Sequence, residues 1–124
     1  MGELIYKNES YQIIGACMEV HKELGKGFSE IIYGDSLEIE FKKNTITYSR
    51  EKRFNIKYKG ETLPHYYIPD FVIDNKIILE IKAIENLTSS HLKQTLNYLA
   101  ATKIKLGLLV NFGEDSLKYK RVVL

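Results

Sequence analysis

The chain has 124 residues, of which 44% are apolar and 27% charged, with one cysteine and a net charge of +2. This size suits one hydrophobic core, so we expect a single globular domain over residues 1–124. The small net charge provides no overall field that would attract nucleic acid by itself. A lone cysteine excludes an internal disulfide, and the polar start Met1–Glu9 predicts neither a signal peptide nor a membrane span. We therefore expect a cytoplasmic protein with no membrane partner.

Two helices are expected at the start of the chain. Apolar side chains at helical spacing predict the first over Ser10–Leu24, and Gly25 can end it. Ser29 is a suitable N-cap for the second, which continues to about Lys43 and carries Glu30 in its first turn.

The hydrophobic period then changes to that of β-strands. Lys59-Gly60 supplies a turn within this region, and Asp74-Asn75 is turn chemistry that joins the last two strands into a hairpin. The β-branched and aromatic residues predict four strands in all: Thr45–Ser49, Phe54–Tyr58, Tyr66–Ile73 and Ile77–Ile84.

One more helix and strand complete the predicted core. A leucine stripe predicts a helix over Ser89–Thr102, and an apolar run predicts a buried strand over Lys105–Phe112, which Gly113 stops. Ser116–Leu124 is interpreted as a last edge strand, with a dimer contact or a disordered end as alternatives. The expected order is α-α-β-β-β-β-α-β-(β), a mixed α/β layer architecture.

The predicted hairpin brings charged residues together. Its turn places Asp70 roughly opposite Glu80, and Glu80 and Lys82 share one face because strand side chains alternate. Two carboxylates beside an ammonium group suit a hard divalent cation, and they suit phosphodiester hydrolysis next to it. The alternative is a structural ion pair, since both faces of this strand are apolar and buried charges need partners.

The basic residues are unevenly distributed. Such groups can bind phosphates, although solvated strand edges carry lysines for solubility as well. Two groups stand out: Lys42, Lys43, Arg50, Lys52, Arg53, Lys57 and Lys59, and then Lys118, Lys120 and Arg121.

The order of these features resembles the PD-(D/E)xK nuclease superfamily. Asp70, then Glu80-x-Lys82 on the next strand, a helix and a buried strand match the pattern of its restriction-endonuclease-like core. That resemblance implies a central mixed β-sheet flanked by helices. Residues Gly27–Tyr33 spell G-x-x-E-x-x-Y, which is similar to the GxxExxY family of small prokaryotic members.

A third motif lies on the helix expected after the hairpin. Gln94 and Tyr98 reproduce the Q-x-x-x-Y pattern of RecB-type nuclease domains, and four-residue spacing puts them on one helical face. The resemblance implies that this face looks at the site and binds substrate or orders a ligand. The alternative is that Tyr98 packs as half-buried core while Gln94 is solvated. Each motif is weak alone, but together they span about Tyr11–Phe112.

The resemblance implies a role for each matching residue. Asp70 and Glu80 match the superfamily's ligands for Mg²⁺ or Mn²⁺, and the backbone carbonyl of Ile81 would be a further ligand. Lys82 matches the lysine that positions or activates the attacking water. Glu30 matches a helix carboxylate that completes the acidic cluster, directly or through a water; the alternative is a glutamate that stabilises the start of its helix.

Two further side chains belong to the G-x-x-E-x-x-Y motif or precede it. Tyr33 is expected to pack against the core with its hydroxyl on a polar partner. RecB-type domains use an upstream histidine as an extra metal ligand, and His21 precedes the motif, but a structural role for His21 is the alternative.

The function implied by the resemblance is metal-dependent hydrolysis of phosphodiester bonds in nucleic acid, with DNA favoured over RNA. One alternative is a non-catalytic nucleic-acid-binding or regulatory module on the same fold. Another is a structural protein in which the charges form buried ion pairs. Because 124 residues offer little surface to grip a duplex, a homodimer or a partner protein is expected to supply the rest, with a short single-stranded or flapped substrate as the alternative.

Overall fold

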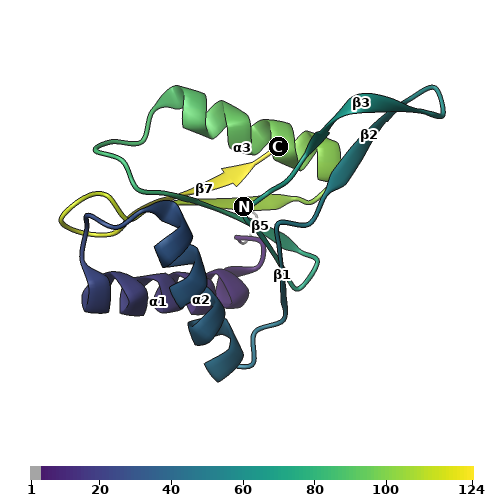
Figure 1. The fold of residues 1–124 in the computed structure, drawn as a ribbon. Coiled ribbons are helices and arrows are strands. Elements are labelled where there is room, and N and C mark those ends of the chain that lie inside the picture. Colours follow the sequence, from purple (N-terminus) through teal and green to yellow (C-terminus); the bar gives the residue numbers. More distant parts are fainter. Residues whose placement is uncertain (1–3) are drawn as a thin grey trace.

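Figure 1 shows the computed structural model, which describes residues 4–124. The expectation drawn from Met1–Glu9 therefore rests partly on residues 1–3, which lie outside the described residues. No helix within residues 4–124 combines the length and apolar character needed to cross a bilayer. The elements in chain order are α1 Lys7–Leu24, α2 Glu30–Lys43, β1 Tyr48–Arg50, β2 Phe54–Tyr58, β3 Glu61–Tyr67, β4 Phe71–Ile73, β5 Ile77–Lys82, α3 Ser89–Thr102, β6 Leu106–Asn111 and β7 Lys118–Val123.

Five strands form the main sheet in the order β1-β4-β5-β6-β7. β5 and β6 are parallel and the other neighbours are antiparallel, so the sheet is mixed. Helices α1 and α2 cover one face and α3 covers the other (Figure 1). The predicted class, a mixed α/β fold with a central mixed sheet flanked by helices, is confirmed.

Strand β5 lies at the centre of the sheet, with apolar side chains on both faces. Leu79 and Ile81 pack with the helices α1 and α2, whereas Ile78 packs beneath α3 against Leu99 and Leu109. The expectation of a strand buried on both sides is therefore confirmed. Since side chains alternate, Glu80 points to the α3 face together with Ile78.

The hairpin turn follows its predicted chemistry. Asp74 and Asn75 have φ angles of 52° and 55°, and the Lys76 amide donates to the Ile73 carbonyl at 2.9 Å. Two consecutive left-handed residues fit a type I′ turn, whose twist matches that of the paired strands. The resulting register pairs Phe71 with Leu79 and so sets Asp70 beside Glu80.

The predicted strand Tyr66–Ile73 is wrong, because the structure breaks it into two strands in different sheets. Its first part belongs to β3, which pairs with β2 in a separate two-stranded sheet, and its last part is β4. Pro69 lies at the break, and a proline has no amide hydrogen to donate to a ladder. The observed order therefore contains one more strand than predicted.

Strands β5 and β7 end close to their predicted limits. β5 stops at Lys82 rather than Ile84 because the chain beyond it leaves the ladder. β7 pairs antiparallel with β6 at the edge of the sheet, so the edge-strand interpretation of Ser116–Leu124 is confirmed. Arg121 ties this strand to α1 through a 2.9 Å hydrogen bond to the Ser10 hydroxyl.

Candidate active site

Asp70 and Glu80 are held together by reciprocal hydrogen bonds. The backbone amide of Asp70 donates to Oε1 of Glu80 at 3.0 Å, and the amide of Ile81 donates to Oδ2 of Asp70 at 2.8 Å. The break at Pro69 leaves the Asp70 amide available for this side chain instead of a ladder partner. The two carboxyl groups thus meet where β4 begins beside the central strand β5.

Glu80 occupies an electrostatically unfavourable position for a carboxylate. Its residue is only 3% exposed. Burial is the main cause that raises the pKa of Glu80, to about 9, and the charge of Asp70 and a hydrogen bond with the Asp70 side chain raise it further. The Asp70 amide and the charge of Lys82 act in the opposite direction. Two carboxyl groups this close cannot both ionise cheaply unless positive charge is added between them.

Lys82 does not neutralise this pair directly. Its Nζ donates to Oε1 of Gln94 on α3 at 3.2 Å, and within residues 4–124 no ion pair joins Lys82 to Asp70 or Glu80. The simplest form of the structural ion-pair alternative, with Lys82 as the partner of a buried carboxylate, is therefore not what the structure contains.

Gln94 and Tyr98 both reach this site from one face of α3. Gln94 contacts Lys82, as described above. Burial and then the charges of Glu80 and Asp70 raise the pKa of Tyr98 to about 12, which places its hydroxyl within the field of both carboxyl groups. Its ring also meets Tyr67 of β3 edge-on, with ring centroids 5.1 Å apart. The part that Gln94 and Tyr98 take in substrate binding stays a prediction.

Glu30 shares a cavity with Asp70, although neither Glu80 nor Lys82 lines that cavity. Glu30 is exposed in the first turn of α2 and lines a cavity of about 230 Å³ with Asp70 and Ile81. Across residues 4–124, no three His, Cys, Asp or Glu side chains are close enough to hold one metal ion together. The directly assembled cluster is therefore not formed, and a water-mediated role for Glu30 stays a prediction, as does the Ile81 carbonyl ligand.

The cavity has one wall that the sequence did not predict. Arg50 and Glu51 both line it, and the Glu51 amide donates to the Asp70 carbonyl at 3.0 Å. The Arg50 guanidinium donates to Asp35 at 2.6 Å and to Glu38 at 2.7 Å. A Cβ at Gly34 would collide with Arg50. A signal was present in the basic run, but nothing in it distinguished Arg50 from its neighbours.

Tyr33 explains the local structure of the G-x-x-E-x-x-Y segment. The side chain is fully buried, its hydroxyl donates to the Gly25 carbonyl at 2.6 Å, and it accepts from the Phe28 amide at 3.3 Å. Its ring stacks on Phe112 with centroids 4.5 Å apart. The tyrosine thereby fixes the loop that leads into α2, and with it the position of Glu30. The expectation for Tyr33 is confirmed.

His21 makes contacts that favour its structural alternative. Its Nε2 lies 2.9 Å from the carbonyl oxygen of Glu114, so this nitrogen donates a proton. Its ring also lies against Phe112, with centroids 6.1 Å apart. These contacts belong to the loop after β6 rather than to the Asp70–Glu80 pair.

Asn111 is a buried polar residue that sequence reasoning treated only as part of an apolar run. Its Oδ1 accepts from the amides of Ile84 and Gly113, both at 3.0 Å, and its Nδ2 donates to the Ile84 carbonyl at 2.9 Å. These bonds satisfy the backbone just after Lys82, where the chain leaves the sheet. Asn111 therefore fixes the end of β5 that carries Lys82.

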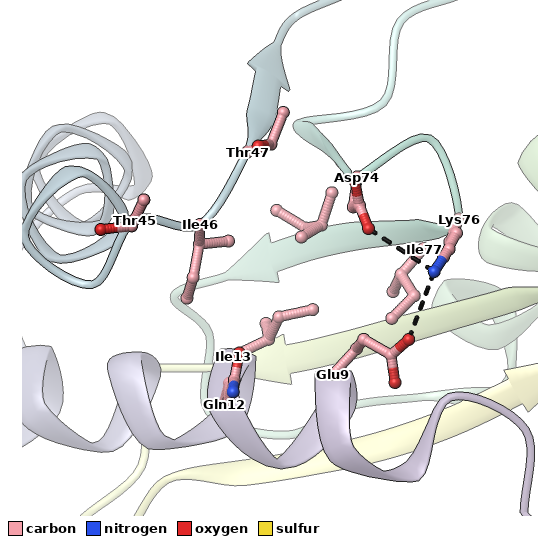
Figure 2. Close-up of a pocket in the computed structure, with 10 residues that line it drawn as sticks. Glu9, Gln12, Ile13, Thr45, Ile46, Thr47, Asp74, Lys76 and Ile77 are labelled. Carbon is pink, nitrogen blue, oxygen red and sulfur yellow. Dashed lines mark hydrogen bonds and ion pairs between the residues drawn. The ribbon is translucent and has the colours of Figure 1, made fainter.

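A second polar cavity lies at the opposite end of β5 (Figure 2). It has a volume of about 150 Å³, and Lys76 bridges its two acids there, Glu9 at 3.5 Å and Asp74 at 3.6 Å. The charges in this cavity are already paired within the protein. The Asp70–Glu80 pair, in contrast, joins a buried and a half-buried carboxyl group without a basic partner in an ion pair among residues 4–124, which makes it the stronger candidate for a cation.

Comparisons with known proteins give one family match and two similar solved structures. A sequence profile of the PD-(D/E)XK nuclease superfamily matches residues 7–122. The crystal structure of SSO0001 has a TM-score of 0.59 and 21% identity, covering 95% of this chain and 60% of that one. The crystal structure of an alkaline exonuclease from Laribacter hongkongensis, LHK-Exo, has a TM-score of 0.46 and 14% sequence identity. That match covers 99% of this chain and 72% of the exonuclease chain. The chain thus spans about 60% of the length of SSO0001. No curated protein sequence matches it.

Proposed function

We propose that this chain, which belongs to the PD-(D/E)XK nuclease superfamily, hydrolyses phosphodiester bonds in nucleic acid with the help of a divalent cation. The observation that carries the proposal is the hydrogen-bonded pair of Asp70 and the buried Glu80, with Lys82 on the same face of β5 as Glu80. Within the superfamily framework these three residues take the positions of the acidic and basic members of the motif.

The residues present fit a hard divalent cation such as Mg²⁺ or Mn²⁺. Asp70 and Glu80 would hold it, because carboxylate oxygens are the donors these ions prefer, and two adjacent carboxyl groups, of which Glu80 is buried, need positive charge to ionise together. Glu30 would add a ligand through water, and the Ile81 carbonyl a direct one. When bound, the cation would polarise the scissile phosphate and lower the pKa of a bound water.

Lys82 acts on the attacking water and on the phosphate. Its ammonium group can donate to the water that attacks in line and to the oxygens on which negative charge develops. Gln94 keeps this flexible side chain at the site through the 3.2 Å hydrogen bond. Tyr98 is protonated at neutral pH, as tyrosines ordinarily are, and its raised pKa extends this to alkaline pH, so its hydroxyl is available as a donor to substrate. No covalent intermediate is part of this mechanism.

The finer details are part of the same proposal. We infer DNA as the substrate in preference to RNA, a single domain, a cytoplasmic location and membership of the GxxExxY family. A homodimer or a partner protein would extend the surface that grips the substrate, because a chain of this size covers little of a duplex.

The test is cleavage of plasmid DNA, single-stranded DNA and RNA with Mg²⁺ or Mn²⁺, comparing the wild type with Lys82→Ala. We expect the variant to lose about 100-fold or more in cleavage rate, because it lacks a donor to the developing charge but keeps both carboxyl groups. EDTA should abolish cleavage by the wild type. No cleavage by either protein would favour the non-catalytic binding module, and equal cleavage by both would reject the assignment of Lys82.

A further inference from the structure

The β2–β3 hairpin is the one pair of strands within residues 4–124 that lies outside the main sheet. We define the β2–β3 arm as Lys52–Tyr67, which includes both strands and the residues just before them. Figure 1 shows it extending beyond α3 and the sheet. Six of the seven residues of β3 are exposed, although an isolated two-stranded hairpin is only marginally stable in water. The arm therefore contributes little to the core, and its surface requires another explanation.

The arm is joined directly to the candidate active site. β3 ends at Tyr67, whose ring meets Tyr98 edge-on, and the chain then passes through Pro69 to Asp70. Whatever binds along the arm is thereby guided toward the two carboxyl groups. The end of the arm next to the site is held in place by two contacts. Tyr67 packs against Tyr98 of α3, and three residues later the Asp70 amide donates to Glu80.

The arm carries excess positive charge that the protein itself does not neutralise. Four basic side chains are exposed on it and one acid, Glu61, accompanies them. Within the part of the chain that the structure describes, none of the four forms an ion pair. The basic residues are Lys52, Arg53, Lys57 and Lys59.

Exposed aromatic rings alternate with these cations. Tyr58 is 62% exposed and Tyr66 is 44% exposed. The Arg53 guanidinium lies 3.7 Å from the Tyr66 ring centroid, and the Lys59 ammonium lies 5.5 Å from that of Tyr58. A ring with a cation over one face can offer its other face to a base for stacking, while the cation supplies charge to the neighbouring phosphate.

We propose that the β2–β3 arm binds single-stranded nucleic acid and leads it to the Asp70–Glu80 site. This inference rests on the proposed nuclease function and specifies the form of its substrate. A single strand is favoured over a duplex because bases must be unstacked to lie against Tyr58 and Tyr66, whereas a duplex would offer the lysines only its phosphates. DNA and RNA strands share this chemistry.

The test is fluorescence anisotropy with labelled oligo-dT and oligo-U in EDTA, so that no cleavage occurs. We expect Lys57→Ala/Lys59→Ala and Tyr58→Ala/Tyr66→Ala each to weaken binding about tenfold or more. The lysine variant should also have a shallower salt dependence, by about 1.4 in the slope of log K against log salt. Lys42→Ala/Lys43→Ala is the matched control, since it removes two exposed lysines at the far end of α2 and should bind within about twofold of the wild type.

Arm variants that bind as tightly as this control would overturn the inference, as would equal affinity of the wild type for a duplex. Stronger binding of oligo-dT or of oligo-U identifies which strand the arm prefers. The two proposals fail separately in this design. If the wild type cleaves but the arm variants bind normally, only the arm proposal is rejected. If the arm variants lose binding but the wild type never cleaves, only the nuclease proposal is rejected.

Discussion

Asp70→Asn is expected to lower cation-dependent cleavage by about 10³-fold or more while leaving the protein folded. The amide oxygen can still accept the hydrogen bond that the Ile81 amide donates at 2.8 Å, so the backbone partner is kept. The negative charge is lost, and with it one of the two proposed cation ligands. Initial rates at saturating Mn²⁺, with melting temperatures measured in parallel, give the comparison.

The matched control for this variant is Asp74→Asn. Asp74 lies in the turn at the other end of β4 and pairs with Lys76 in the second cavity (Figure 2). The same chemical change there should leave the cleavage rate within about twofold, because exposed ion pairs contribute little to structure. Similar losses of activity in both variants would mean that Asp70 has no special role in cleavage.

Glu80→Gln is expected to stabilise the cation-free protein at alkaline pH. The pKa of Glu80 is raised by burial and by Asp70 to about 9, above its ordinary value of 4.5. The stability that the protonated Glu80 contributes is fully present below about pH 4.5 and is lost as the pH rises through about 9. Between these two pH values Glu80 is ionised in the unfolded chain but protonated in the folded one, so rising pH favours unfolding. Glutamine cannot ionise, so the variant should not show this decline.

Urea unfolding in EDTA at pH 5 and pH 8.5 measures the effect. The variant should exceed the wild type by on the order of 3 kcal/mol in free energy of unfolding at pH 8.5, and the two should be similar at pH 5. Glu30→Gln removes an exposed carboxylate from the cavity that Asp70 lines and serves as the control, with little expected change. A Glu80→Gln protein that is less stable than the wild type at both pH values would favour the structural ion-pair alternative.

Most of the fold could be predicted from local patterns. The helical period of α1 and α3, the Gly25 stop and the Asp74-Asn75 turn depend on residues close in sequence, and each appears where expected. β3 escaped prediction because its side chains are exposed on both faces, so it lacks the alternation by which a half-buried strand is recognised. The role of Pro69 in ending one strand and separating it from the next was also not predicted from the sequence.

The site was predictable where it followed from strand geometry. Alternation and the turn were enough to place Asp70, Glu80 and Lys82 together. Arg50 and Asn111 were not predictable, because their roles arise from contacts with residues distant in sequence. A buried asparagine and a buried valine occupy similar positions in an apolar run, and only the tertiary hydrogen bonds distinguish them.

The central claim is that Asp70 and Glu80 together hold a divalent cation, and calorimetric titration with Mn²⁺ tests it most directly. The wild type should bind Mn²⁺, and Asp70→Asn and Glu80→Gln should each lose at least tenfold in affinity, since each removes a carboxylate ligand. Asp74→Asn should bind as the wild type does, because its carboxylate is paired with Lys76 at the other end of the hairpin. Binding that is equal in all four proteins, or absent from the wild type, would contradict the account.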